Sequence, residues 1–452
     1  YEAHPPFYYS LLHVWSLLTG ETLLARRLLG LSCGIATVVL AGVAAGRLPG
    51  RRRGRVVTAA VAITSLHPLL IAMSREVRPY PVMTAVYAAA TLALLHLMTD
   101  SARGQRLGRT AVAGFFIAEA LMLWLHDLGP FYGLAMSLAL LAGVAGRALT
   151  RADWVRLAVG QGLVGLCYLP SLVITLGQAS AWMHATWLHF DQGKLPMEIG
   201  TIYWNWNLLA RVAGVLLAVG GVAVLARSAA NGLRMASALL LLGVVPMALS
   251  VAISAAFAPV FLDRTLSPTA VPMALLCAAA LGASGRWRWT AVALLAPVLV
   301  PATAQDLAAA RGAPRQDWYG ALRWLTPRVR AGDEVWTYPN DGALPLEYAL
   351  HDRGRRLAVR PIPGPVPALG FRGTHPTGTM GVIALYPEDI ARLAAGPVGH
   401  LPKRIWLVQV FGAEYDPHRV MVRELGRTRR AFDHWQSRGI EITGFGVWQS
   451  PR

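Results

Sequence analysis

Charged residues are scarce in this chain, and their scarcity excludes a whole class of fold. Only 15% of the 452 residues are charged and 55% are hydrophobic. An ordinary soluble chain carries roughly 25% charged residues. A single soluble globule is therefore excluded.

Cysteine is also rare, and no initiating methionine is present. Cys33, Cys167 and Cys277 all fall in apolar segments, so no disulfide framework and no CxxC metal motif is predicted. The chain opens at Tyr1 with a polar, proline-bearing segment that lacks a charged start or hydrophobic signal. We expect a further N-terminal piece, including a helix, to precede it.

Positive charge is plentiful, with 42 Lys and Arg against 24 Asp and Glu. A net charge of +18 is also found in nucleic-acid-binding proteins. Here the arginines lie mostly in short connections between apolar runs, and no basic stripe alternates with aromatic residues. The pattern indicates membrane orientation and predicts no nucleic acid partner.

Ten apolar stretches are long enough to cross the roughly 30 Å of a bilayer core. They lie near residues 23–46, 56–73, 80–98, 110–126, 128–146, 155–176, 207–226, 235–259, 266–283 and 287–303. Every second connection is rich in arginine, as in Arg51–Arg55 and Arg147–Arg156. Because cytoplasmic loops carry the excess of Lys and Arg, Tyr1 and the chain after about residue 304 are predicted outside. We expect a multi-pass protein of the plasma (inner) membrane with an extracytoplasmic C-terminal domain.

From residue 304 the pattern changes, which divides the chain into a membrane domain (1–303) and an outer domain (304–452). Strand-like runs are predicted at Glu334–Tyr338, Gly381–Tyr386, Arg404–Phe411 and Ile440–Trp448. Helical runs are predicted at Leu344–His351, Pro387–Ala395 and Arg419–Arg438. This alternation favours a small α/β domain that covers the outer face of the membrane domain.

Two features inside the apolar stretches favour helix packing. Gly160–Gly165 matches GxGxxG, but no strand precedes it, so close helix approach is a better interpretation than nucleotide binding. Glu119 lies seven residues before His126 on one helical face. It is either a packing partner or the floor of a polar cavity, and the lack of a cation in that stretch favours packing.

Polar motifs gather in the connections predicted outside. They are Glu2–Tyr9, which contains His4, two prolines, Tyr8 and Tyr9; Ser74–Tyr80, which contains Arg75, Glu76 and Arg78; His126–Asp127; and Asp263–Arg264. Each could be an interfacial anchor, since tyrosine belongs to aromatic belts and arginine snorkels at helix ends. Arginines on the side where topology disfavours them instead indicate a site for a phosphate.

The outer loop from Gln178 to Asn207 is rich in tryptophan and histidine. It is predicted as an amphipathic interfacial helix, with a sugar- or lipid-binding wall as the alternative. His184 and His189 lack a third ligand for zinc.

The order of these motifs resembles that of GT-C glycosyltransferases that use polyprenyl-linked sugars, such as protein mannosyltransferases and aminoarabinose transferases. His4–Tyr9, with Gly20 and Arg26–Leu29 behind it, resembles the family's HPPLYY…G…RL signature. Ser74–Tyr80 resembles its SxEARxY turn, and Arg264 with Pro268 resembles an altered RYLLP element. The resemblance covers roughly residues 1–300 and implies a GT-C-like polytopic fold.

The resemblance implies sugar transfer from a polyprenyl phosphate or diphosphate to an extracytoplasmic glycan, lipid or protein, with inversion. Such chemistry needs an acid as base and cations for the leaving phosphate. It implies donor phosphate binding by His4, Arg75, Arg78 and Arg264, and substrate contacts from Tyr8, Tyr9, Tyr80 and His126. The available acids are Glu2, Glu76 and Asp127, and the family's usual base, in the first outer loop, would precede Tyr1.

The resemblance leaves the cofactor open, because relatives differ in metal dependence; no cofactor is predicted and a divalent metal stays an option. Two other functions are weighed. A transporter or flippase of lipid-linked sugars would need polar residues through the midplane and inverted repeats, of which only Glu119 is seen. A non-catalytic scaffold would need a closed, uncharged outer face.

Overall fold

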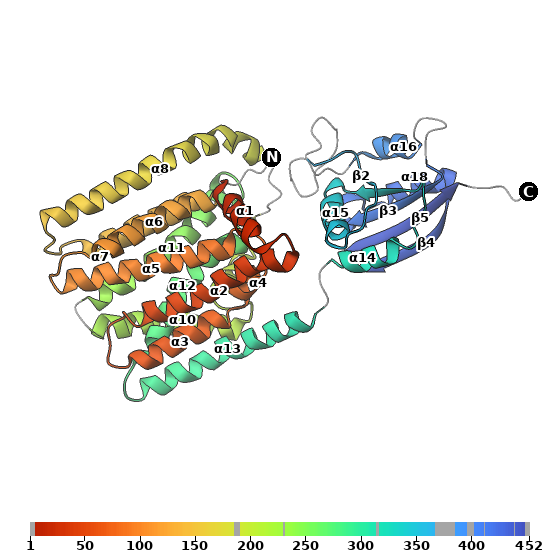
Figure 1. The fold of residues 1–452 in the computed structure, drawn as a ribbon. Helices are drawn as coiled ribbons and strands as arrows, with labels where there is room; N and C mark the ends of the chain where they lie inside the picture. The colour runs from red at the N-terminus through yellow and green to blue at the C-terminus, as the bar shows by residue number, and fades with distance from the viewer. Residues whose placement is uncertain are drawn as a thin grey trace, which may run out of the picture. The chain divides into compact units, whose positions relative to one another are not determined.

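The computed structural model describes residues 5–184, 190–228, 231–312, 316–366, 385–395, 402–410, 412–437 and 439–447. Two compact units make up the chain (Figure 1). A helical unit comprises Glu2–Ser180 and His189–Arg311, and an α/β unit is built mainly of Gly312–Arg452. The boundary predicted after residue 303 stays a prediction; α13 (Trp287–Arg311) runs across that position.

The helical unit has several segments long and apolar enough to cross a bilayer. Within the described residues seven qualify: α2 (Leu23–Ala45), α5 (Tyr80–Ala102), Arg151–Gly177 of α8 (Arg151–His184), α10 (Leu208–Ser228), α11 (Gly232–Ala256), Asp263–Gly282 and α13. Asp263–Gly282 consists of η1 (Asp263–Thr269), α12 (Ala270–Ala279) and η2 (Ala280–Gly282). The polytopic helical class is thereby confirmed.

The remaining apolar stretches are also helical but shorter or bent. The pair α3 (Arg53–Ser65) and α4 (Pro68–Ser74) forms an eighth candidate span with a bend of 58°. The helices α6 (Arg109–Leu125) and α7 (Gly129–Val144) have 17 and 16 residues. Helical structure thus occurs at all ten predicted stretches, while the count of ten spans stays a prediction. Two further helices, α1 (Phe7–Thr19) and α9 (Leu195–Tyr203), lie outside these stretches.

The bend between α3 and α4 follows from the dipeptide His67–Pro68. A proline disfavours helical geometry at the residue before it. His67 accordingly has an extended backbone, with φ −78° and ψ 116°. Pro68 then starts α4, where its missing N–H costs nothing. The short helix α4 leads directly into the turn that carries Arg75.

Buried tyrosines tie the core of the helical unit to η1. The hydroxyl of Tyr132 in α7 donates a 2.7 Å hydrogen bond to the carbonyl of Thr265. Tyr87 in α5 donates a bond of the same length to Leu242, and the rings of Tyr87 and Tyr132 meet edge to face at 5.0 Å. A buried phenol needs a partner for its hydroxyl. The Tyr132 bond ties η1, which carries Arg264, to α7, and the Tyr87 bond ties α5 to α11.

Helix packing is observed at Gly160 and Glu119, whereas a Cβ at Gly162 or Gly165 would meet nothing within 4 Å. A Cβ at Gly160 would lie 2.2 Å from the ring of Phe116 in α6, so this glycine allows close approach. Glu119 is buried, and its Oε1 accepts hydrogen bonds from Ser137 at 3.0 Å and Gln161 at 3.1 Å. Glu119 therefore joins α6 to α7 and α8.

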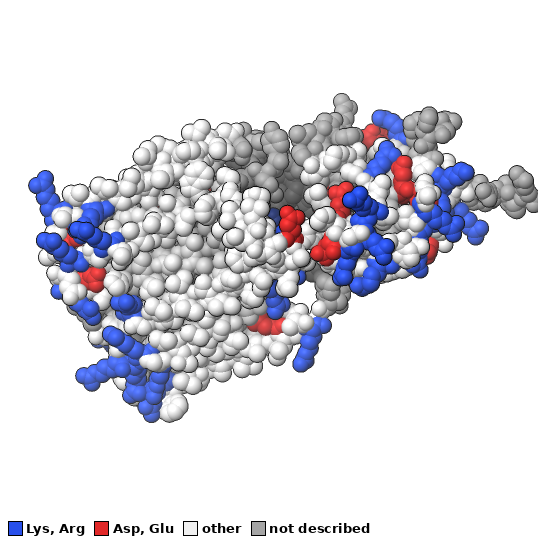
Figure 2. Space-filling view, viewed as in Figure 1, with Lys and Arg blue, Asp and Glu red and all other residues white. Residues whose placement is uncertain are grey.

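Basic residues gather at one end of the helical unit. Figure 2 shows Lys and Arg concentrated there, over the starts of α3, α8 and α13. The connection that leads into α3 alone holds Arg51, Arg52 and Arg53. The arginine-rich connections that the sequence assigns to the cytoplasm thus lie at one end of the helices.

The α/β unit contains one five-stranded sheet in the order β2-β1-β3-β5-β4. The strands are β1 (Glu334–Tyr338), β2 (Val359–Pro361), β3 (Arg404–Val410), β4 (Arg429–Ser437) and β5 (Ile440–Val447), and only β2, β1 and β3 are parallel. The helices are η3 (Asn340–Gly342), α14 (Trp318–Leu325), α15 (Ala343–Asp352), α16 (Pro387–Ala395), α17 (Gly412–Tyr415) and α18 (Val420–Thr428). A hydrophobic core covers each face of the sheet, which confirms the predicted small α/β domain.

One predicted element of this unit is wrong in its second half. The helix expected over Arg419–Arg438 ends at Thr428, and β4 follows it at once. The chain then reverses through Gly439, whose φ is +71°, and β4 pairs with β5 in an antiparallel hairpin. Pairing with β5 overrides the local helical pattern. The strand expected at Gly381–Tyr386 lies mostly outside the described residues.

Candidate functional site

The turn between α4 and α5 carries Arg75, Glu76 and Arg78, and α2 holds it closely. A Cβ at Gly30 of α2 would lie 2.7 Å from the carbonyl oxygen of Ser74 and 3.3 Å from that of Glu76. A glycine is required where two backbones approach so closely. The position of the turn is therefore fixed by backbone packing.

Tyr80, directly after this turn, is the centre of a cluster of aromatic and charged side chains. The ring centroids of Tyr80 and His126 lie 6.0 Å apart. The guanidinium carbon of Arg264 lies 5.8 Å from the ring centroid of Tyr80. Tyr80 and His126 are 4% and 5% exposed. Segments far apart in the sequence therefore meet at one buried phenol.

Arg78 and Glu76 belong to the same cluster. The charges of Arg264, Arg78 and Glu76 all act on the Tyr80 hydroxyl, and Arg264 also hydrogen-bonds to it. Tyr8 in α1 is buried beside Arg78 and Cys33; its burial raises the pKa of the Tyr8 phenol, and the charge of Arg78 opposes that rise. The Tyr80 cluster thus consists of Tyr8, Glu76, Arg78, Tyr80, His126 and Arg264.

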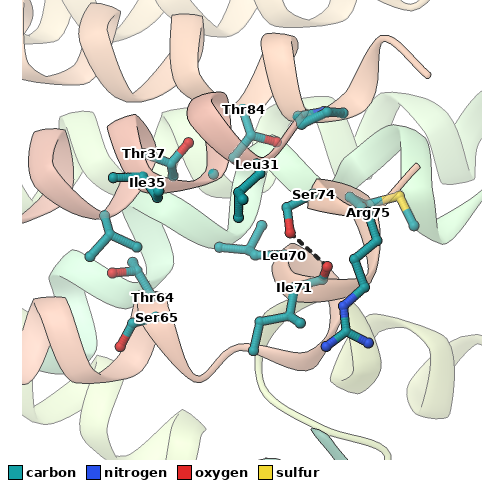
Figure 3. Close-up of a pocket in the computed structure, with 14 residues that line it drawn as sticks. Leu31, Ile35, Thr37, Thr64, Ser65, Leu70, Ile71, Ser74, Arg75 and Thr84 are labelled. Carbon is teal, nitrogen blue, oxygen red and sulfur yellow. Dashed lines mark hydrogen bonds between the residues drawn. The ribbon is translucent and has the colours of Figure 1, made fainter. Parts of the chain in front are cut away.

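Arg75 belongs to a neighbouring cavity between α2 and α4, which we call the α2/α4 cavity. Its volume is about 320 Å³, and its wall is largely apolar. In Figure 3, Leu31 and Ile35 of α2 and Leu70 and Ile71 of α4 line it, with Arg75 at one end. An apolar space with a guanidinium at one end suits an amphiphile with an anionic head.

Asp306 is a residue near Arg75 that the sequence analysis missed. It lies near the end of α13, and the charge of Arg75 acts on its carboxyl group. One of its oxygens, Oδ2, is buried without a hydrogen-bond partner among the described residues. Its position at the end of an apolar stretch was the available signal, because an ionisable residue there is costly.

Asp127 and Tyr9 are the other predicted site residues that the structure describes. Asp127 follows His126 in the chain, but its charge acts on Tyr168 of α8. The ring of Tyr9 packs edge to face on Tyr8 at 5.4 Å. Glu2 and His4 lie outside the described residues, as do the side chains of His184 and His189. The roles proposed for these residues stay predictions.

Glu198 of α9 is a second acid that the sequence analysis missed. It is half-buried, and burial followed by the negative charge of Asp263 raises the pKa of its carboxyl above the ordinary 4.5. Asp263 directly precedes Arg264. The surrounding tryptophan-rich loop concealed this acid, because aromatic residues dominate its pattern.

The raised pKa of Glu198 predicts a pH-dependent stability. Between 4.5 and the raised value the folded state binds more protons than the unfolded one, so Glu198 lowers stability as pH rises through that window. Glu198→Gln should therefore raise the thermal unfolding midpoint at pH 8 and not below pH 4.5. Glu388→Gln, which removes an exposed carboxylate of α16, is the control. Equal midpoints for wild type and Glu198→Gln at pH 8 would contradict the prediction.

Taken together, these groups can bind an anion and accept a proton. Arg78 and Arg264 offer forked donors suited to phosphate oxygens, and Glu76, whose charge also acts on Tyr80, offers a carboxylate. Within the ranges that the structure describes, no three His, Cys, Asp or Glu side chains are grouped as a metal ion would need.

The sequence matches no family model and no curated protein. Its structure is similar to that of ArnT from Cupriavidus metallidurans, with 13% identity and TM-scores of 0.58 for the apo state and 0.60 for the form bound to undecaprenyl phosphate. These matches cover 98% and 97% of this chain and 88% and 87% of ArnT. An oligosaccharyltransferase from Archaeoglobus fulgidus, tethered to an acceptor peptide, matches at 13% identity and TM-score 0.51, over 99% of this chain and 66% of the other. The chain therefore has the GT-C fold that these two glycosyltransferases share.

Proposed function

We propose that this chain is a membrane glycosyltransferase that moves a sugar from a polyprenyl phosphate or diphosphate to an acceptor on the extracytoplasmic face, with inversion. The observation that carries the proposal is the Tyr80 cluster, where the charges of Arg78, Arg264 and Glu76 all act on one buried phenol. A shared fold alone does not fix a function. The cluster supplies the two groups that this reaction requires, namely cations for a phosphate and a carboxylate for a proton.

The reaction assigns a task to each side of the cluster. The acceptor hydroxyl oxygen forms a bond to the anomeric carbon, and the bond from that carbon to the lipid phosphate breaks. Arg78 and Arg264 stabilise the negative charge that develops on the leaving phosphate. Glu76 accepts the proton of the acceptor hydroxyl. Attack opposite the leaving group inverts the anomeric configuration.

The α2/α4 cavity supports a polyprenyl carrier. Its apolar wall suits a hydrocarbon chain, and Arg75 lies at one end. Asp306 beside Arg75 would orient that guanidinium. The undecaprenyl phosphate bound in a structure of ArnT supports the same class of carrier.

Orientation follows from the charge distribution. The arginine-rich end in Figure 2 is assigned to the cytoplasm, because positive residues are retained there. The turn Arg75–Arg78 follows the end of α4, in one of the connections that alternate with the arginine-rich ones. The Tyr80 cluster would accordingly face the extracytoplasmic side, where the sugar acceptor is presented.

Glu76→Gln tests the proposal in purified full chain reconstituted in nanodiscs with undecaprenyl phosphate sugars. If Glu76 is the base, sugar transfer should fall by about 10²- to 10⁴-fold while donor binding is kept. Glu388→Gln should retain wild-type transfer. Wild-type protein that forms no covalent product from any polyprenyl donor would overturn the proposed function. Accumulation of unaltered donor inside sealed vesicles would instead indicate a transporter.

A further inference from the structure

A second apolar groove lies between α9 and α10, and we call it the α9/α10 groove. Its volume is about 510 Å³. Leu195 and Ile199 of α9, Val212 and Leu216 of α10, Trp204 between these helices, and Arg211 contribute to its lining. None of them belongs to the Tyr80 cluster or to the α2/α4 cavity. The groove is a separate feature.

The wall contributed by α10 is exposed and entirely apolar beyond Arg211. Leu208, Val212 and Leu216 are 64%, 50% and 50% exposed, although α10 is a candidate membrane span. Exposed apolar side chains on a membrane-spanning helix face lipid chains. The α9/α10 groove therefore opens toward the hydrocarbon of the bilayer.

Among the residues that the structure describes, Arg211 is the only charged one that lines this groove. Its Nη1 donates a 3.1 Å hydrogen bond to the carbonyl of Pro196, while Nε is buried without a partner in the described structure. A Cβ at Gly200 would lie only 2.0 Å from Cδ of Arg211, so this glycine leaves room for the arginine side chain. A guanidinium against an apolar membrane-facing wall favours an anion beside it.

The start of α10 adds to the attraction for an anion. Asn207 caps the helix, because its Oδ1 accepts a 2.8 Å hydrogen bond from the N–H of Leu209. Arg211 lies in the first turns of the same helix. The N-terminal end of a helix carries partial positive charge, which reinforces that of the guanidinium.

We propose that the α9/α10 groove binds an anionic phospholipid of the surrounding bilayer, with its phosphate at Arg211 and an acyl chain along Val212 and Leu216. Free phosphate would occupy only the end of the groove at Arg211 and would leave its apolar lining without a partner, so a lipid suits the groove better. None of the described residues that line the groove is a carboxylate, so this lining offers no base for a sugar acceptor. The bound lipid packs against α9, the helix that carries Glu198.

Native mass spectrometry of the delipidated full chain, titrated with phosphatidylglycerol or phosphatidylcholine, tests the charge requirement. The wild type should bind the first phosphatidylglycerol about fivefold more tightly than phosphatidylcholine, as one arginine at a membrane surface provides. Arg211→Gln should abolish that preference. Arg227→Gln, which removes an exposed arginine from the last turn of the same helix, should retain it.

Filling the groove tests its apolar part independently of charge. Val215→Trp should displace the bound phosphatidylglycerol, because Val215 lines the groove. Val219→Trp, one turn further along α10, is the matched control, since Val219 is 62% exposed and outside the lining. An unchanged preference in Arg211→Gln would overturn the proposal, and so would displacement of phosphatidylglycerol from the wild type by inorganic phosphate. Displacement by low concentrations of undecaprenyl phosphate would assign the groove to the donor and would also overturn it.

Discussion

Replacing Arg264 by glutamine is expected to lower kcat/KM for sugar transfer by about 10²- to 10³-fold, the loss typical of removing one preorganised donor from a developing anion. Arg264 lies in η1, which the Tyr132 hydroxyl holds through Thr265, so its guanidinium is fixed relative to Tyr80. Its charge should act on the leaving phosphate more than on the bound donor. Most of the loss is therefore expected in kcat, measured with a radiolabelled sugar donor in nanodiscs.

A matched arginine separates this effect from a general loss of positive charge. Arg227→Gln removes an exposed arginine of α10 at the basic end of the bundle and should leave kcat/KM within about twofold of wild type. Equal activity of Arg264→Gln and Arg227→Gln would contradict the proposed role of Arg264 in sugar transfer. A thermal unfolding curve of Arg264→Gln similar to wild type would show that the fold is intact.

Gly221→Ala is expected to destabilise the helical unit severely. A Cβ at this position would lie 1.8 Å from the backbone oxygen of Leu276 in α12. Because the obstacle is backbone and α12 is almost wholly buried, neither helix can yield locally. Overpacking of this kind costs about 3 kcal/mol or more, and it should appear as a large fall in the unfolding midpoint by fluorescence-detected size-exclusion chromatography.

The neighbouring glycine provides the control. A Cβ at Gly220 would lie 3.6 Å from Cβ of Ala280, which is an ordinary contact. Gly220→Ala should therefore keep the wild-type midpoint or raise it, since alanine favours the helix by up to about 1 kcal/mol. If Gly221→Ala were as stable as Gly220→Ala, the close approach of α10 and α12 would be wrong.

The sequence predicted the helices and the sheet best where a strong periodic or apolar signal was present. All ten apolar stretches are helical, and β1 and α16 have the predicted bounds. The failures arise where a distant partner decides the structure. Arg429–Ser437 forms a strand because β5 pairs with it, and a single segment carries no sign of its partner. The bend at His67 could have been predicted from Pro68.

The site was predictable in composition but not in grouping. The motifs named Tyr80, His126 and Arg264, which lie close together in the structure, and their roles in a site stay predictions. They could not separate Arg78 from Arg75, three residues away, although the first lies by Tyr8 and the second by Asp306. Glu198 and Asp306 are outside every motif, and only the packing of α9 and α13 brings Glu198 near Asp263 and Asp306 near Arg75.

The break at His67–Pro68 leaves α4 as a separate helix of only seven residues. One side of α4 forms a wall of the α2/α4 cavity, and the turn that carries Arg75 and Arg78 follows the end of this helix. Gly30 of α2 packs closely against the backbone of that turn. A hydrocarbon chain that separated α2 from α4 would therefore also displace the turn and its two arginines. If a polyprenyl carrier occupies the cavity as proposed, the thickness of its chain would therefore influence where Arg75 and Arg78 meet the phosphate.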